Sequence, residues 1–402
     1  MNRLARLAEF LGLRRSVMGA FGMVILVGLG ERMAERFLPL YLIALGGGEV
    51  LAGLLNGMDN LLSALYSYPG GYLSDRLGVK RSLLVFNLLA MAGYLVVILI
   101  PAWPAVFIGS ALFLSWSAIS MPATMDLISV ALPKNKRTMG VSMHSLVRRV
   151  PMALGPVIGG GLIVRYGTLD GLRLAFAVAL VLAAVSAVLQ QGLIGEECEK
   201  KEDDGACVPP PEKNPLVLFR EMSPRLRNLL VSDALIRFCE QIPYAYVVIW
   251  AVTRVAHPVT EFQFGVLTAA EMVTAVAVYI PVAWHADRGS KKPFVAVTFV
   301  FFTLFPLALL FSQSFWPLLA VFVLRGLKEF GEPTRKALIM DLAPEGRKAA
   351  MFGLYYLMRD TIVSVAAFGG AGLWLISPTV NFLTAFGFGV AGTAWFVWKG
   401  KG

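Results

Sequence analysis

The sequence predicts an all-α integral membrane protein of twelve transmembrane helices, arranged as two pseudo-symmetric bundles of six. Composition is the first reason: of 402 residues, 57% are hydrophobic and only 15% are charged, whereas soluble proteins carry roughly 25% charged residues. The second reason is that apolar blocks of about 20 residues recur along the whole chain, each long enough to cross a hydrocarbon core. The alternating pattern of an outer-membrane barrel is absent.

Twelve apolar blocks, taken in chain order, are expected to be the membrane helices. The first follows the basic, amphipathic segment MNRLARLAEFLGLRRS, and its apolar run is too long for the core of a cleavable signal peptide. The long polar stretch 196–226 predicts a cytoplasmic linker between an N-terminal bundle, 1–195, and a C-terminal bundle, 227–402. The predicted helices are 16–42, 50–72, 82–101, 105–132, 139–165, 173–195, 227–253, 262–286, 294–313, 316–343, 349–375 and 378–398.

Basic residues between the helices gather in alternate loops, among them those that contain Arg76, Lys134, Arg288 and Arg347. By the positive-inside rule this asymmetry places both termini in the cytoplasm, which requires an even number of spans. We therefore expect a multi-pass protein of the inner (plasma) membrane. We also expect it to be a monomer, with the lipid bilayer as its surroundings. The net charge of +10 follows from this topology, so no nucleic-acid partner is expected.

The third observation is an internal repeat. SDRLG at 74–78 corresponds to ADRGS at 286–290, and MPATMDLISVALPKNKR at 121–137 corresponds to EPTRKALIMDLAPEGRK at 332–348. Continuing without a gap, Arg148 falls on Arg359 and Gly159 on Gly370. A duplicated six-helix unit predicts a solute site near the bilayer midplane between the halves, with alternating access by rocking.

These residues resemble a known family. GGYLSDRLGVKRSLL at 70–84 is similar to the Gly-x-x-x-Asp-Arg-x-Gly-x-[Arg/Lys]-[Arg/Lys] loop signature of the major facilitator superfamily, and PVAWHADRGSKK at 281–292 resembles its second, degenerate copy. Gly155-Pro156-Val157-Ile158-Gly159-Gly160 matches the core of a motif found in proton-driven exporters, with Pro151 in place of an upstream glycine. The resemblance implies that superfamily's fold and an exporter-like secondary transporter. The fourth helix lacks the membrane arginine of many such exporters, whereas its counterpart, the tenth, has Arg325.

The two loop motifs have a physical use in gating. An Asp at a helix end can accept hydrogen bonds from a neighbouring helix N-terminus, and an Arg can bridge to an acid across the cytoplasmic gap. Such contacts would latch the outward-facing state and break when the halves rock. The predicted gating residues are Asp75, Arg76, Asp287 and Arg288.

Charged residues inside the predicted helices are the most informative feature for function. An isolated charge at the bilayer centre costs about 2.5–3.5 kcal/mol on insertion scales, so many of them must face an interior cavity and pair with one another. Acids and bases nearly balance, as expected of a paired network. They are Glu31, Glu35, Asp59, Asp233, Glu240, Glu271, Glu329, Glu332 and Asp360, and Arg32, Arg36, Arg148, Arg149, Arg237, Arg325, Lys328 and Arg359.

Arginines on repeat-related helices are the candidate substrate ligands. Arg32 and Arg237 lie on the first helix of each half, and together with Arg148 and Arg359 they would hold a carboxylate or phosphate in bidentate fashion. A Glu follows Arg32 and Arg237 three residues later on the same helical face, and would neutralise each of them in part.

Carboxylic acids in a cavity that loses water can load and unload a proton as access alternates. The candidate proton carriers are Glu31, Asp59, Glu240 and Glu271. Tyr244 and Tyr246, set among the charges of the seventh helix, are candidates to line the substrate cavity.

The leading functional prediction is a proton-coupled secondary active transporter that exports a polar or amphiphilic small molecule. One alternative is an importer or exchanger of organic anions that uses the paired arginines, and another is a flippase for lipid headgroups. From a different class, a membrane sensor or scaffold would show no solute flux. Because the sequence contains no Walker loop, nucleotide fingerprint, HExxH or CxxC pair, neither enzymatic activity nor a cofactor or metal is expected.

Overall fold

A computed structural model describes residues 15–77, 79–114, 137–193, 219–286, 291–344 and 348–399. Every regular element in these ranges is a helix, and each of the twelve predicted helices corresponds to at least one of them. The predicted fold class is therefore confirmed. Most of the polar linker and the second half of the predicted fourth helix lie outside the described residues. The chain forms two compact units, residues 1–47 with 62–205 and residues 48–61 with 206–402.

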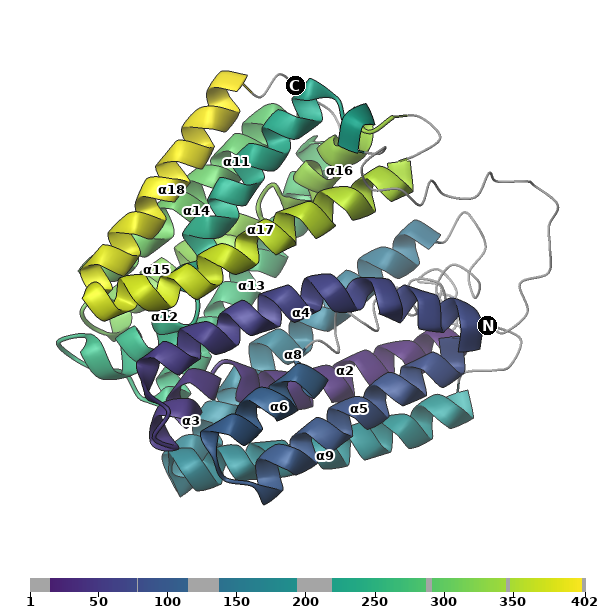
Figure 1. Cartoon of the computed structure of the whole chain (residues 1–402), viewed down its shortest axis with the longest axis vertical. Coiled ribbons are helices and arrows are strands. Elements are labelled where there is room, and N and C mark those ends of the chain that lie inside the picture. The colour runs from purple at the N-terminus through teal and green to yellow at the C-terminus, as the bar shows by residue number, and fades with distance from the viewer. Residues whose placement is uncertain are drawn as a thin grey trace. The chain divides into compact units, whose positions relative to one another are not determined.

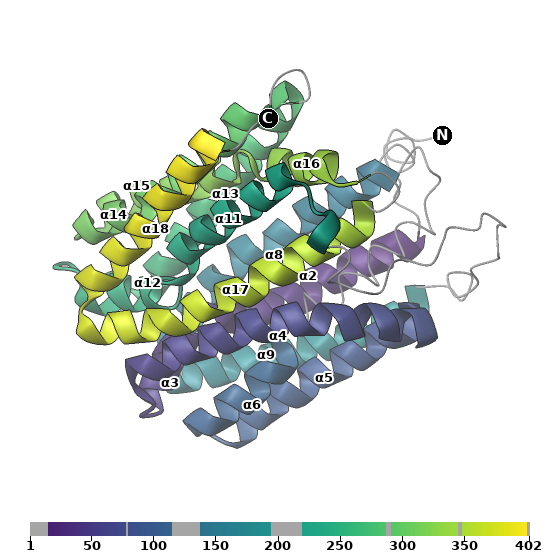
Figure 2. The same ribbon diagram turned by 45° about the horizontal axis from the view of Figure 1, so that its top comes forward.

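The first unit is built around the first long helix. Helix α2 (Arg15–Glu35) packs against α8 (Arg137–Tyr166) and α9 (Thr168–Leu193), and α5 (Val79–Leu99) packs against α6 (Trp103–Phe113) and α9 (Figure 1 and Figure 2). The short helix α3 (Leu38–Ala44) continues α2 and also contacts α9. Buried aromatic rings join these helices: the ring of Tyr94 stacks on Phe113 at 5.0 Å, and Phe113 lies 5.6 Å from Phe176.

The second unit repeats this arrangement. Helix α11 (Pro224–Gln241) packs against α17 (Lys348–Ile376) and α18 (Pro378–Lys399), and α14 (Lys292–Phe311) packs against α15 (Phe315–Gly326) and α18 (Figure 1). Helix α13 (Glu261–Ala286) packs against α15. These neighbour pairs of α11 and α14 have counterparts in those of α2 and α5, as the sequence repeat predicts.

Within the described residues, three predicted helices are broken, each near a proline or glycine. The first is split by a turn before α3, whose first turn contains Pro39. The seventh is interrupted after α11 at Pro243, and then continues as α12 (Tyr246–Ile249) and the π-helical turn η3 (Trp250–Arg254). The tenth consists of α15, the 3₁₀ turn η4 (Leu327–Glu329) and α16 (Glu332–Leu342). Proline removes a helical hydrogen bond, so such breaks are expected near it.

Helix α4 (Gly48–Leu77) contributes to both units, because its first half, residues 48–61, groups with the second unit. Gly53 admits close packing: a Cβ there would lie 2.9 Å from the Cβ of Ala371 on α17. The carboxylate of Glu49 accepts hydrogen bonds from Arg254 at 2.7 Å and from the Trp374 indole at 2.6 Å.

Eight helices among the described residues are long and apolar enough to cross a membrane. Helices α2 and α4 and the segments of the broken tenth helix are outside this set. The broken tenth helix also contributes charged side chains to the candidate site described below. The spans are Lys80–Leu99, Val147–Tyr166, Thr168–Gly192, Pro224–Arg254, Glu261–Val278, Lys292–Phe311, Met351–Ile376 and Pro378–Lys399.

Candidate functional site

Charged side chains of the second unit meet because of their spacing along two helices. Asp233, Arg237 and Glu240 follow one another on α11 at intervals of four and three residues. Residues three or four apart share one face of a helix, so these side chains form a single row. The broken tenth helix has a matching row at intervals of three, four and three residues: Arg325, Lys328, Glu332 and Arg335.

In the middle of the site, oppositely charged side chains from the two rows pair with one another. Arg237 donates to the Glu240 carboxylate at 2.6 Å, and Lys328 Nζ donates to the other oxygen of Glu240 at 2.8 Å. Arg237 also lies 3.6 Å from Glu332. Charge-assisted hydrogen bonds of this length are roughly twice as strong as neutral ones, so the two rows are tied together electrostatically.

Arg335 is a deeply buried cation of the site, with a side chain 1% exposed. Its guanidinium holds Glu332 in bidentate fashion, with hydrogen bonds of 3.0 and 2.6 Å, and also donates to Asp233, which is equally buried. The Tyr355 hydroxyl donates to the same Asp233 oxygen at 3.0 Å. A planar fork with several donors suits a buried site where each donor needs an acceptor.

Arg359 on α17 extends the pairing to a further helix. Its guanidinium lies 3.6 Å from Asp233 and donates to the neighbouring Asp360 at 2.7 Å. The ring of Tyr356 lies under the guanidinium, 4.2 Å away. Because Arg359 contacts both acids, it connects α17 to the row on α11.

Glu271 on α13 is at the other end of the site, with a fully buried side chain. Arg325 and Lys328 each lie 3.4 Å from the same carboxylate oxygen of Glu271. These contacts form one continuous series in which bases and acids alternate, and we call this series the ion-pair chain. Its members in order are Arg325, Glu271, Lys328, Glu240, Arg237, Glu332, Arg335, Asp233, Arg359 and Asp360.

Aromatic rings from α14 cover the cations at one end of the ion-pair chain. The Arg325 guanidinium lies 4.8 Å from the centre of the Phe305 ring, and those of Arg237 and Lys328 lie 5.3 and 5.8 Å from Phe302. The negative face of an aromatic ring attracts a cation, most strongly where water is absent. The rings therefore stabilise the cations and separate them from the surrounding apolar helices.

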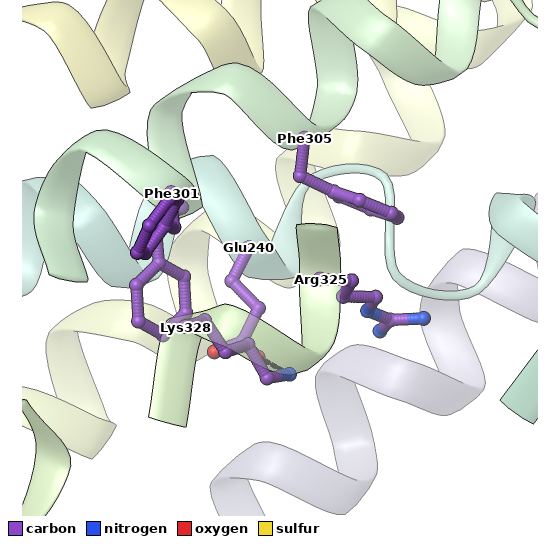
Figure 3. Close-up of a pocket in the computed structure, with 6 residues that line it drawn as sticks. Glu240, Phe301, Phe305, Arg325 and Lys328 are labelled. Atoms are coloured by element: carbon purple, nitrogen blue, oxygen red, sulfur yellow. Dashed lines mark hydrogen bonds and ion pairs between the residues drawn. The ribbon is translucent and has the colours of Figure 1, made fainter. Parts of the chain in front are cut away.

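A small pocket opens between these groups (Figure 3). About 220 Å³ of space at this point is not filled by atoms, open space included. Figure 3 shows Lys328 beside Glu240, and Arg325 below the Phe305 ring. The lining residues are Glu240, Phe301, Phe302, Phe305, Arg325 and Lys328. The enclosed part is about the size of a single water molecule, so the lining can hold a water next to charged side chains.

The first unit has its own group of charges. Arg32 pairs with Glu35, one turn further along α2, and Glu31 is 2% exposed. Arg148 on α8 interacts electrostatically with Arg32 and Glu31. Gly155 brings the backbones of the two helices together, because a Cβ there would lie 2.6 Å from the Cβ of Arg32.

The predicted site residues therefore fall into separate places. Arg237, Glu240, Glu271 and Arg359 all belong to the ion-pair chain, and the Tyr244 ring lies 5.7 Å from the Arg325 guanidinium. Glu31, Arg32 and Arg148 form the group in the first unit. Tyr246 is buried outside both groups and stacks on Trp374 at 4.4 Å. Asp59 lies on the first half of α4.

The predicted gating residues are described only in part. Asp75 and Arg76 lie in the last turn of α4, and the placement of their side chains is outside what the structure describes. Asp287 and Arg288 lie outside the described residues. The gating role stays a prediction.

Sequence reasoning missed Arg335, although this cation contacts two acids, Glu332 and Asp233. Arg335 lies near the end of the predicted tenth helix, where hydropathy alone does not distinguish an embedded charge from one at the membrane surface. A signal is nevertheless present in the sequence: Arg335 follows Glu332 by three residues and continues the row from Arg325 and Lys328.

A helical membrane protein with a duplicated bundle and buried, mutually paired charges has the features of a secondary transporter. The model of the Major Facilitator Superfamily matches residues 20–253. The chain belongs to this superfamily, and it is an integral, multi-pass membrane protein. An uncharacterised MFS-type transporter of Methanocaldococcus jannaschii is 22% identical over 371 residues, which cover 88% of this chain and 87% of the relative.

Solved structures of transporters share the fold. A peptide transporter POT in complex with sulfate has a TM-score of 0.78 at 16% identity, covering 96% of this chain and 94% of that one. A POT family transporter in complex with 5-aminolevulinic acid has a TM-score of 0.78 at 14% identity, covering 96% of each chain. The human organic anion transporter TETRAN has a TM-score of 0.64 at 16% identity, covering 95% of this chain and 98% of that one.

Proposed function

We propose that this secondary transporter is proton-coupled and moves a polar or amphiphilic small molecule out of the cell by alternating access. The observation that carries the proposal is the ion-pair chain, whose carboxylates include the fully buried Glu271. Replacing buried ion pairs by apolar residues is often neutral or stabilising. Charges retained within membrane helices therefore indicate a pathway for ions or substrate.

In this proposal Glu240 and Glu271 are the proton carriers of the second unit, and Glu31 and Asp59 are the other two. Each carboxylate of the ion-pair chain lies beside a cation, so loading a proton frees that cation for another partner. Export is favoured by the Gly155 to Gly160 segment, which resembles the exporter motif.

The proposed topology follows from the basic loops. Both termini would lie in the cytoplasm, in a monomer of the plasma membrane, with Asp75, Arg76, Asp287 and Arg288 as cytoplasmic latches. The substrate would contact Arg32, Arg148, Arg237, Arg359, Tyr244 and Tyr246. The paired state of Arg32 and Arg237 means that a substrate anion has to compete with Glu35 and Glu240 for the guanidinium groups.

Exchange or import of an organic anion is the second candidate, and the cations that line the pocket favour it. Arg325 and Lys328 supply two cations, which an anion would have to take over from Glu271 and Glu240, and three Phe rings supply an apolar wall. One structural relative is described as an organic anion transporter and another was solved with sulfate. For this candidate, Arg237→Gln should abolish the binding of succinate by the purified protein, and unchanged binding would remove it.

Replacing Glu271 by Gln should uncouple transport from the proton gradient. Proteoliposomes containing the luminal pH dye pyranine would be tested with dialanine, succinate and tetraphenylphosphonium under an imposed pH gradient. For any probe that the wild type accumulates, we expect Glu271→Gln to reduce accumulation by about 5- to 150-fold, the usual range of coupling between two sites. Exchange of the same probe without a gradient should persist.

The control is Asp170→Asn, which removes an exposed carboxylate at the start of α9 in the other unit. It should accumulate the probe like the wild type. Wild-type flux that is indifferent to the pH gradient would contradict proton coupling. Accumulation by Glu271→Gln at the wild-type level would instead contradict the role of this carboxylate alone.

A further inference from the structure

Lys328 occupies an unusual position in the backbone of the second unit. It lies on the 3₁₀ turn η4, between α15 and α16, and glycines flank the turn on both sides. Gly326 packs closely on α13, where a Cβ would lie 2.5 Å from the carbonyl oxygen of Glu271. The backbone N–H of Gly331 donates to the Thr298 hydroxyl at 2.5 Å. A 3₁₀ stretch inside a longer helix often marks a functional hinge.

The two carboxylates beside Lys328 each have an arginine of their own. Glu240 is held by Arg237 at 2.6 Å, and Glu271 lies 3.4 Å from Arg325. The ammonium of Lys328 lies between the two acids, 2.8 Å from Glu240 and 3.4 Å from Glu271. It is therefore a third cation shared by two acids on different helices, and in this structure it is nearer to Glu240. Figure 3 shows its contact with Glu240.

The chemistry of lysine suits a shared position. Arginine presents a rigid fork that fits one carboxylate, whereas the lysine ammonium is a compact charge with three donors on a flexible stem. A small shift of the stem can move the ammonium from one acid to the other. The Phe302 ring, 5.8 Å from Nζ, lies beside the ammonium without adding a competing carboxylate.

We propose that Lys328 is the exchangeable cation that links the protonation of Glu240 to that of Glu271. When a proton neutralises Glu240, the ammonium keeps its own charge and moves towards the Glu271 carboxylate, which it then holds in the ionised form. When Glu271 takes the proton, the ammonium returns to Glu240. Arg237 and Arg325 stay with their own acids throughout the exchange. The role of this exchange in transport rests on the proposed proton coupling.

The test is a double-mutant cycle that needs no substrate. Dicyclohexylcarbodiimide reacts with protonated carboxyl groups in apolar surroundings, and mass spectrometry of the peptide gives the labelled fraction of Glu271. In Glu240→Gln, Glu271 is the carboxylate that remains beside the ammonium among the described residues, so labelling of Glu271 should fall by about threefold or more, within the range of coupling between neighbouring residues. In the Lys328→Gln background, the same Glu240→Gln change should leave Glu271 labelling unaltered.

The matched control is Glu332→Gln, which removes an acid that contacts Arg237 and Arg335. It should change Glu271 labelling by much less than Glu240→Gln does. If Lys328→Gln does not give a monodisperse protein, Lys328→Arg keeps the charge, and its fork should reduce the response of Glu271 to Glu240→Gln.

Two results would overturn the proposal: unchanged Glu271 labelling in Glu240→Gln, or a decrease that persists when Lys328 is replaced. The labelling experiment does not depend on transport. Flux that ignores the pH gradient would contradict proton coupling, but the labelling cycle would still test the role of Lys328.

Discussion

Replacing Arg335 by Met should destabilise the protein by about 3–5 kcal/mol, the usual cost of breaking a buried ion pair by removing one partner. The substitution removes the cation that holds Glu332 in bidentate fashion and also contacts Asp233. Asp233 is 1% exposed and cannot regain solvation by water. We expect a lower melting midpoint in detergent micelles, and a smaller monodisperse fraction on gel filtration.

The neighbouring residue offers a matched control. Lys336 lies 3.7 Å from the same Glu332, but its side chain is 50% exposed. Exposed ion pairs contribute about 0–1 kcal/mol, so Lys336→Met should melt close to the wild type. Adding Asp233→Leu to Arg335→Met should recover part of the loss, because both buried charges are then gone. Equal melting of Arg335→Met and Lys336→Met would contradict the structural importance of this pair.

The fold could be predicted from the sequence because its signals are local or repeated. Hydropathy locates spans one at a time, and the correspondence of Arg148 with Arg359 and of Gly159 with Gly370 identifies two copies of one bundle. The breaks in the helices were not predicted, although Pro39 and Pro243 lie at two of them. Proline is tolerated in membrane helices when neighbours satisfy the freed backbone groups, so its presence alone does not locate a break.

The pairing of charges could be predicted only in outline. The balance of acids and bases indicated a network, and the i, i+3 pairs Arg32–Glu35 and Arg237–Glu240 are visible in the sequence because they are local. The contact between Arg335 and Asp233 depends on how α16 packs against α11, which no local pattern encodes.

The grouping of the first half of α4 with the second unit could not be predicted from the sequence either. The sequence repeat assigns the whole of α4 to the first half of the chain, because homology follows chain order. The compact units are instead defined by contacts in space. Gly53 packs against Ala371 and Glu49 pairs with Arg254, so the first half of α4 groups with the second unit. The predicted boundaries at 195 and 227 rest on the linker composition and stay a prediction.

The glycines of the repeat should respond alike to substitution. A Cβ at Gly159 on α8 would meet the backbone carbonyl of Met33 on α2, with the carbonyl carbon 2.9 Å away. A Cβ at Gly370 on α17 would meet the backbone carbonyl of Ile242, with the carbon 3.2 Å away. Because backbone cannot yield as a side-chain end can, Gly159→Ala and Gly370→Ala should each destabilise the protein by about 1–3 kcal/mol, measured as a lower melting midpoint.

The adjacent glycines give controls of opposite sign. A Cβ at Gly369 or Gly372 would meet nothing within 4 Å, and alanine in a helix is favoured over glycine by roughly 0.5–1 kcal/mol. Gly369→Ala should therefore melt at or above the wild-type midpoint, although it lies next to Gly370 on the same helix. If Gly370→Ala melted like Gly369→Ala, close backbone packing would not explain this glycine. A parallel loss in Gly159→Ala and Gly370→Ala would show that the duplicated bundles share the packing of the fifth and eleventh helices on the first and seventh, independently of their charged sites.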